Sequence, residues 1–148
     1  MTKEVAFSAK ALLANSKGEI LLISEAEGEN RGKFHFPGGK LKHNEKPKDA
    51  LGREVFEETG ISDLRIGTLY YTCSWPAEIG GKALDVVGLF YPCRTDDDGL
   101  LLSSEHSQGL WTPPETACDT LPMVSHSKEI IDAYLRLSLG ERMIEPTA

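Results

Sequence analysis

One short segment constrains this chain more than any other: an acidic helix bounded by glycines. Residues 46–59 carry Pro47 in the first turn and are followed by Gly60, which suits the left-handed residue after a helix. Asn44 is expected to cap the first turn. Apolar residues recur at helical spacing and predict a buried stripe made of Ala50, Leu51 and Val55. Phe56 is expected at the margin of this stripe.

Three carboxylates project from the last two turns of this helix. Glu54 lies three residues before Glu57 and four before Glu58, so the three side chains share one side of the helix. Like charges at that spacing repel, whereas a hard cation such as Mg²⁺ or Mn²⁺ would turn the repulsion into ligation. Arg53 lies one turn before Glu57 and can pair with a carboxylate to orient it. The pattern predicts a site for Mg²⁺ or Mn²⁺.

A glycine-rich segment precedes the helix. Residues 36–39, Phe-Pro-Gly-Gly, are typical of a turn in which the main chain approaches a ligand closely. Gly52, inside the helix, costs roughly 1 kcal/mol relative to Ala and is expected to mark the close approach of another backbone.

Together these residues resemble the signature of the Nudix hydrolases. Gly39, five residues, Glu45, seven residues and then residues 53–61 (REVFEETGI) match it at every defining position. The resemblance implies an α/β fold, the Nudix-type α/β/α sandwich with a mixed β-sheet. It also implies a divalent-metal-dependent pyrophosphohydrolase, in which water attacks one phosphorus of a nucleoside diphosphate linked to another moiety.

The resemblance also implies a role for each signature residue. The metal ligands would be one main-chain carbonyl and three side chains: Gly39, and Glu54, Glu57 and Glu58. Glu45 and Arg53 would form a stabilising pair that holds the loop against the helix.

The sequence leaves two candidates for the catalytic base. Family members place it either on the signature helix or on a later loop, so Glu54 and Glu105 are both candidates. His106, next to Glu105, could take the place of that carboxylate.

Residues 36–40 resemble the MutT-like branch of the family, which acts on nucleoside triphosphates. In that branch the aromatic residue lines the base pocket, so the candidate substrate-binding residues are Phe36, Gly38 and Lys40. The resemblance favours an NTP or dNTP, including an oxidised purine. Two departures disfavour 8-oxo-purine selectivity: residues 121–125 (LPMVS) lack the late Asn, and Ser24 and Glu25 stand in place of a basic residue.

Two alternatives remain. Pro76, fifteen residues beyond Ile61, matches a spacing associated with ADP-ribose hydrolases, so an ADP-ribose or other nucleoside-diphosphate-X pyrophosphatase is the second substrate class. A non-catalytic nucleotide-binding Nudix module is the alternative of another class; it would be expected to have lost signature carboxylates, and none is missing. A purely structural metal site is disfavoured because a carboxylate-rich site for a hard ion keeps open water positions.

The length and the net charge of the chain limit the number of domains and the kinds of partner it can have. The 148 residues, 40% of them hydrophobic, suit one domain over residues 1–148. A net charge of −7 argues against a binder of nucleic-acid polymers or of membranes, which usually carry a basic surface. We expect a small-molecule nucleotide substrate and a cytoplasmic location, since no signal-peptide core is present. A homodimer is compatible with the sequence, but nothing in it requires one.

The remaining candidate ligands follow no spacing pattern. The cysteines are odd in number and lack metal-site spacing, which indicates reduced thiols: Cys73, Cys93 and Cys118. Three histidines lack a spaced partner and are assigned surface or packing roles: His35, His43 and His126. Trp75 and Trp111 are assigned to packing rather than to stacking on a base.

Periodicity elsewhere predicts strands flanked by a second helix. The expected strands are residues 5–13, 19–23, 33–36, 64–75 and 83–94 and a short strand at Leu110 and Trp111. Turns are expected at 15–18 and 76–81, an acidic loop at 96–99 and irregular chain at 113–122. The final helix is expected at 127–139, with a buried side made of Ile130, Ile131, Tyr134 and Leu137.

Overall fold

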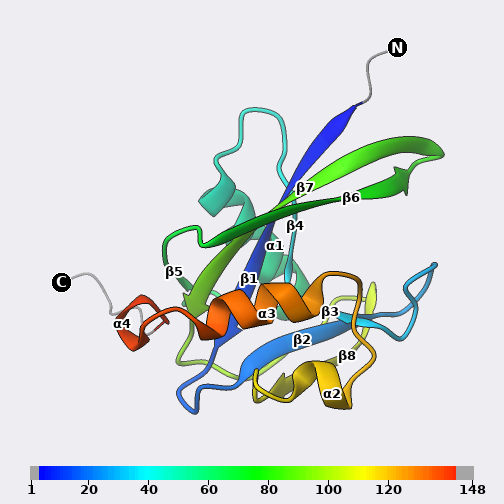
Figure 1. Ribbon diagram of the computed structural model, residues 1–148. Helices are drawn as coiled ribbons and strands as arrows, with labels where there is room; N and C mark the ends of the chain where they lie inside the picture. The colour runs from blue at the N-terminus through cyan, green and yellow to red at the C-terminus, as the bar shows by residue number, and fades with distance from the viewer. Residues whose placement is uncertain (1–3, 143–148) are drawn as a thin grey trace.

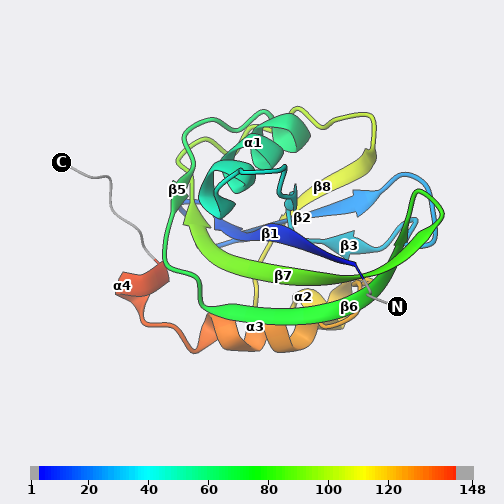
Figure 2. The same ribbon diagram turned by 90° about the horizontal axis from the view of Figure 1, so that it is seen from above.

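A mixed sheet lies between helices in the structure, a computed structural model that describes residues 4–142. Helix α1 (Pro47–Thr59) covers one face, and α3 (Ser127–Leu135) covers the other with the short α2 (Ala117–Thr120), as Figure 1 and Figure 2 show. Helix α4 (Leu139–Arg142) follows α3. The predicted α/β/α sandwich is therefore confirmed. No helix within residues 4–142 has the length and apolar character needed to cross a bilayer.

The sheet is built around two long strands, β1 (Val5–Ala14) and β7 (Lys82–Arg94). They pair in parallel, from Val5 opposite Asp85 to Ala14 opposite Arg94. The strand order is β3-β2-β1-β7-β5, with β4 on β1, β6 on β7 and β8 on β2, and these other pairs are antiparallel. The remaining strands are β2 (Ile20–Glu25), β3 (Phe34–His35), β4 (Gly38–Lys40), β5 (Arg65–Ile66), β6 (Tyr71–Ile79) and β8 (His106–Thr112).

Alternation along β1 and β2 creates a core on each face of the sheet, because successive side chains of a strand point to opposite faces. The core under α1 contains Ala9, Ala11, Leu13, Leu21, Ile23, Leu51 and Val55. The core under α3 contains Leu12, Ile20, Leu22, Phe36, Phe90, Ile130, Ile131 and Tyr134. The predicted stripes of both helices are thus buried, except that Leu137 lies beyond α3 and is half-buried.

Helix α1 occupies nearly the predicted range, but its first turn is different. The helix ends at Gly60, whose φ of 77° is left-handed and whose N–H donates to the Phe56 carbonyl, as expected. The N-cap is Lys46, which makes no side-chain capping bond, so the prediction of Asn44 was wrong. Asn44 instead takes a φ of 62° in the preceding turn. Phe56 is 55% exposed and does not border the core.

The chain after α1 differs from the expectations at four places. The turn predicted at 76–81 lies at Gly80 and Gly81, both with positive φ, because β6 continues through Pro76 to Ile79. Within the described residues β6 pairs only with β7, and an edge strand tolerates a proline. The strand predicted at 64–75 is divided between β5 and β6, and α2 forms within the segment predicted to be irregular. Strand β8 also extends further than the short strand predicted at residues 110–111.

The glycine pair is part of a strand rather than a turn. Gly38 and Gly39 begin β4, which pairs with β1. A Cβ on Gly38, whose φ is +135°, would lie 2.0 Å from the Ala9 carbonyl oxygen, and a Cβ on Gly39 would lie 2.4 Å from the Glu54 carboxyl carbon. A Cβ on Gly52 would meet nothing within 4 Å, so the close approach predicted there was wrong.

These two environments predict opposite effects of adding one methyl group. Gly38→Ala should lower the free energy of unfolding by about 3 kcal/mol or more, because the Cβ meets backbone at a φ that L side chains rarely adopt. Gly52→Ala should raise it by about 0.5–1 kcal/mol, since Ala is the better helix former. Urea unfolding of both variants measures the difference. Equal stability of the two variants would contradict the close β4–β1 packing.

Candidate functional site

The three predicted metal ligands lie on the last two turns of α1 and are here called the carboxylate cluster: Glu54, Glu57 and Glu58. Their side chains differ in exposure: 21% for Glu54, 53% for Glu57 and 9% for Glu58. The cluster therefore runs from solvent at Glu57 to the edge of the core at Glu58.

Glu58 is held by the backbone of β4. The Gly38 N–H donates to Glu58 Oε1 at 2.7 Å, and His106 Nε2 lies 3.5 Å from Glu58 Oε2. Burial raises the pKa of Glu58 from 4.5 to about 7, although the Lys10 ammonium and the Gly38 N–H act in the opposite direction. Without a cation beside it, this carboxyl is poised to be protonated near neutral pH.

Arg53 ties the carboxylate cluster to the preceding loop. Its Nε and Nη2 donate to the two Glu45 carboxylate oxygens at 2.8 and 2.9 Å, so the predicted Glu45–Arg53 pair is confirmed as a bidentate contact. The same guanidinium donates to Glu54 at 2.9 Å and to the Lys40 carbonyl at 3.1 Å, and lies 3.4 Å from Glu57. Hydrogen bonding to Arg53 lowers the pKa of Glu45 to about 2.

The donor set is chemically suited to a hard cation. Carboxylate oxygens and main-chain carbonyls are the ligands that Mg²⁺ and Mn²⁺ prefer. Gly39 lies directly against the Glu54 carboxylate, with no room for a side chain between them. The structure thus brings the four predicted ligand residues to one end of α1: Gly39, Glu54, Glu57 and Glu58.

The late-loop candidates for the base lie in different environments. Glu105 is exposed in the turn before β8, where its carbonyl accepts a hydrogen bond from the Ala26 N–H at 3.0 Å. His106 is buried, and it is the one that approaches Glu58.

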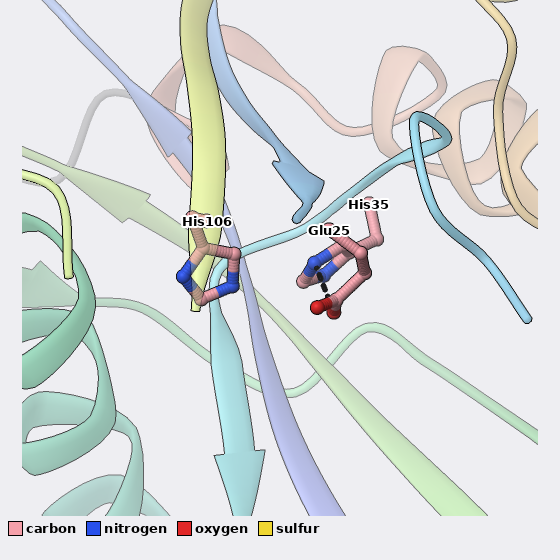
Figure 3. Close-up of side chains that lie close together, drawn as sticks. All are labelled: Glu25, His35 and His106. Atoms are coloured by element: carbon pink, nitrogen blue, oxygen red, sulfur yellow. Dashed lines mark ion pairs between the residues drawn. The ribbon is translucent and has the colours of Figure 1, made fainter. Parts of the chain in front are cut away.

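A second cluster of polar groups lies beside the first: the His–Glu cluster, composed of Glu25, His35 and His106 (Figure 3). One potential ligand atom from each residue lies within 4.8 Å of the others. His35, assigned a surface or packing role from the sequence, is buried, and its Nε2 lies 2.8 Å from Glu25 Oε1. No fixed spacing links these residues. They meet because β2 pairs with both β3 and β8, with Glu25 opposite His106.

A cavity of about 350 Å³ adjoins the His–Glu cluster. Its walls combine aromatic side chains, polar and charged side chains and the start of α3: Phe36, Trp75, Pro76 and Phe90; Lys10, Glu25, Glu29, Asn30 and His35; and Val124, Ser125, His126 and Ile130. Lys10 Nζ lies 3.5 Å from the Gly38 carbonyl oxygen, which connects the cavity to the strand that binds Glu58.

The three predicted substrate-binding residues lie in different environments, and one of them lines the cavity. Phe36 lines the cavity and meets Phe90 edge-on, with ring centroids 6.0 Å apart. Gly38 is buried in β4, and Lys40 is exposed and does not line the cavity. Trp75, predicted only to pack, lies in the cavity wall.

Comparisons with known proteins identify the family to which the chain is similar. A profile of the NUDIX domain family matches residues 5–134. The chain is 30% identical over 128 residues to CTP pyrophosphohydrolase from Escherichia coli (strain K12), covering 86% of this chain and 90% of that protein. It is 30% identical over 114 residues to 8-oxo-dGTP diphosphatase from Haemophilus influenzae, covering 75% of this chain and 78% of that protein.

A solved structure extends the likeness to the fold. The MutT protein from Methanosarcina mazei Go1 superimposes with a TM-score of 0.74 at 28% identity, covering 92% of this chain and 96% of that one. The family profile spans the strands, the acidic helix and most of α3. The chain belongs to the Nudix family.

Proposed function

We propose that this protein is a divalent-metal-dependent pyrophosphohydrolase that cleaves the phosphoanhydride of a nucleoside triphosphate. The observation that carries the proposal is the complete carboxylate cluster on α1, packed against Gly39 and connected through Lys10 to an aromatic cavity. Two relatives that match over most of their length are a CTP pyrophosphohydrolase and an 8-oxo-dGTP diphosphatase, which supports a triphosphate substrate.

The residues present fit the divalent ion that Nudix hydrolases generally use. Glu54, Glu57 and Glu58 would hold Mg²⁺ or Mn²⁺ together with the Gly39 carbonyl. When bound, such an ion neutralises phosphate charge and lowers the pKa of a bound water. The completeness of this set also argues against a non-catalytic module.

The chain's own residues would prepare the reaction around that ion. Arg53 fixes the Glu54 carboxylate, and Glu45 in turn fixes Arg53, so Glu54 is oriented to bind or deprotonate the attacking water. Glu54 is the leading base in this proposal because Glu105 is exposed in a separate turn. The Lys10 ammonium, at the cavity wall, supplies a positive charge for the phosphates.

Within the triphosphates, we favour a pyrimidine nucleotide over an 8-oxo-purine. Ser24 is buried and Glu25 is engaged with His35, so neither position supplies the basic residue found in purine-selective relatives. The match to the CTP enzyme covers the larger share of both chains. ADP-ribose is the second candidate substrate, favoured by the position of Pro76 in the cavity wall.

Product analysis tests the substrate class. Purified protein with Mg²⁺ should release pyrophosphate and a nucleoside monophosphate from triphosphates, with kcat/KM highest for CTP or dCTP in a panel that includes 8-oxo-dGTP, ADP-ribose, dinucleotides and sugar nucleotides. AMP and ribose 5-phosphate from ADP-ribose as the preferred reaction would favour the second candidate. Binding of nucleotides without turnover of any would leave only the non-catalytic module.

Removing one ligand charge tests the metal role. Glu57→Gln should reduce turnover by about a hundredfold or more, because the exposed carboxylate serves ligation and not packing. Thermal unfolding should be nearly unchanged. Glu78→Gln, an exposed carboxylate on β6, is the matched control and should keep full activity. A fully active Glu57→Gln enzyme would refute the assigned ligand role.

Glu58 predicts a pH dependence of stability. The pKa of Glu58 is about 7 in the folded protein and 4.5 for an ordinary Glu carboxyl, so the folded state binds the proton more tightly than the unfolded state does. The metal-free protein should therefore lose stability as the pH rises from about 4.5 to about 7. Burial lowers the pKa values of His35 and His106, so these two residues change the stability with pH in the opposite direction. The contribution of Glu58 is therefore measured as the difference in unfolding free energy between the wild type and the Glu58→Gln variant. That difference in unfolding free energy should shift by roughly 2–3 kcal/mol between about pH 5 and about pH 8 with EDTA.

Saturating Mg²⁺ provides the control for this titration. Because the cation favours the ionised carboxylate, it should restore the stability of the wild-type protein at the upper pH. The Glu58→Gln variant should show a smaller gain. Parallel pH profiles of the two proteins without metal would contradict the buried, proton-binding Glu58.

A further inference from the structure

We propose that Glu25, His35 and His106 form a second metal site, which takes a divalent transition ion such as Zn²⁺ rather than Mg²⁺. The three residues come from β2, β3 and β8 and direct one ligand atom each toward a common point, within 4.8 Å of one another. The site shares no residue with the carboxylate cluster and differs from it in donor chemistry, although His106 Nε2 also lies 3.5 Å from Glu58 Oε2.

The first supporting observation is a buried nitrogen of His35 without a hydrogen bond. His35 Nδ1 lies 3.1 Å from the Phe36 carbonyl, which can only accept, so Nδ1 carries the hydrogen. Nε2 is then left facing Glu25 Oε1 at 2.8 Å, yet it has no hydrogen-bond partner of suitable geometry, and the side chain is only 10% exposed.

The tautomer set by the Phe36 carbonyl strengthens this point. With the hydrogen on Nδ1, a neutral His35 ring would present the Nε2 lone pair toward the Glu25 carboxylate oxygen. A cation between them would stabilise this arrangement of two acceptors. Glu25 and the nearby Glu58 carboxylate offset the charge of Lys10 in the same region.

The second observation concerns how both imidazoles are held. Histidine ligands of metals usually have the other ring nitrogen fixed by an oxygen, which sets the orientation of the ring. His35 Nδ1 contacts the Phe36 carbonyl, and His106 Nδ1 contacts Ser103 Oγ at 3.0 Å. In Figure 3 the His106 ring turns a nitrogen toward Glu25 and His35. Both rings are thus oriented as metal ligands are.

Donor type selects the ion. Two imidazole nitrogens and one carboxylate suit Zn²⁺ and other first-row transition ions, whereas Mg²⁺ prefers oxygen. Ligands about 2.1 Å from a tetrahedral ion are about 3.4 Å apart. Ligand atoms that lie up to 4.8 Å apart would therefore have to approach by about 1.4 Å, and His35 Nε2 and Glu25 Oε1, at 2.8 Å, would have to move slightly apart. Glu25 and His35 also line the cavity, so the open coordination position of a three-ligand site would face it.

Calorimetric titration of the full chain with Zn²⁺, in an excess of Mg²⁺ that occupies the carboxylate cluster, tests the proposal. We expect one equivalent to bind, and His35→Gln and Glu25→Gln to weaken that binding by about tenfold or more. His43→Gln is the matched control: His43 is exposed in the loop before α1 and belongs neither to the cavity wall nor to the His–Glu cluster. Zn²⁺ affinity of this variant should match that of the wild type.

Location of the ion gives a second readout. Anomalous diffraction from crystals grown with Zn²⁺ and Mg²⁺ should place zinc among Glu25, His35 and His106, and circular dichroism should show that the variants are folded. Glu57→Gln should keep the calorimetric Zn²⁺ site. Zinc found only on Glu54, Glu57 and Glu58, no zinc binding in excess Mg²⁺, or wild-type affinity in folded His35→Gln and Glu25→Gln would each overturn the proposal.

Discussion

The close packing of β4 between β1 and α1 is the constraint on which the site depends. Gly38 approaches the backbone of β1, and Gly39 approaches the Glu54 carboxylate, at distances that exclude any side chain. Because the strand sits so close, its Gly38 N–H can reach Glu58 and its Lys40 carbonyl can reach Arg53. The backbone of one three-residue strand therefore positions both the most buried carboxylate and the arginine that orients the others.

The same helix accepts an unfavourable distribution of charge. Its carboxylates gather at the C-terminal end, where the helix dipole is negative, and its last turn contains no basic residue. Arg53 offsets part of this repulsion through contacts with Glu45, Glu54 and Glu57. Under the proposed function, a bound cation would relieve the remaining repulsion between these carboxylates, and the charges that disfavour this helix end would then serve ligation.

Features encoded within a few neighbouring residues could be predicted from the sequence, whereas features created by the pairing of distant strands could not. The range of α1, its buried stripe and the first hairpin are encoded within a few residues of one another, and they were predicted. The strand at Gly38 was predicted as a turn because its partner is β1, far away in the chain. The His–Glu cluster was missed for the same reason: strand register alone brings Glu25, His35 and His106 together. Pro76 was read as a turn because nothing local indicates an edge strand.

The parallel pairing of β1 with β7 also bears on how the chain folds. The first strand finds its long partner only after more than half of the chain has been made, with Val5 opposite Asp85. Such topology raises contact order, and high contact order slows folding. During synthesis one edge of β1 would stay unpaired until β7 emerges from the ribosome, and the apolar face of β1 and β2 that packs under α3 would stay uncovered until α3 follows. A nascent chain of this kind is a natural client for chaperones that shield hydrophobic surface.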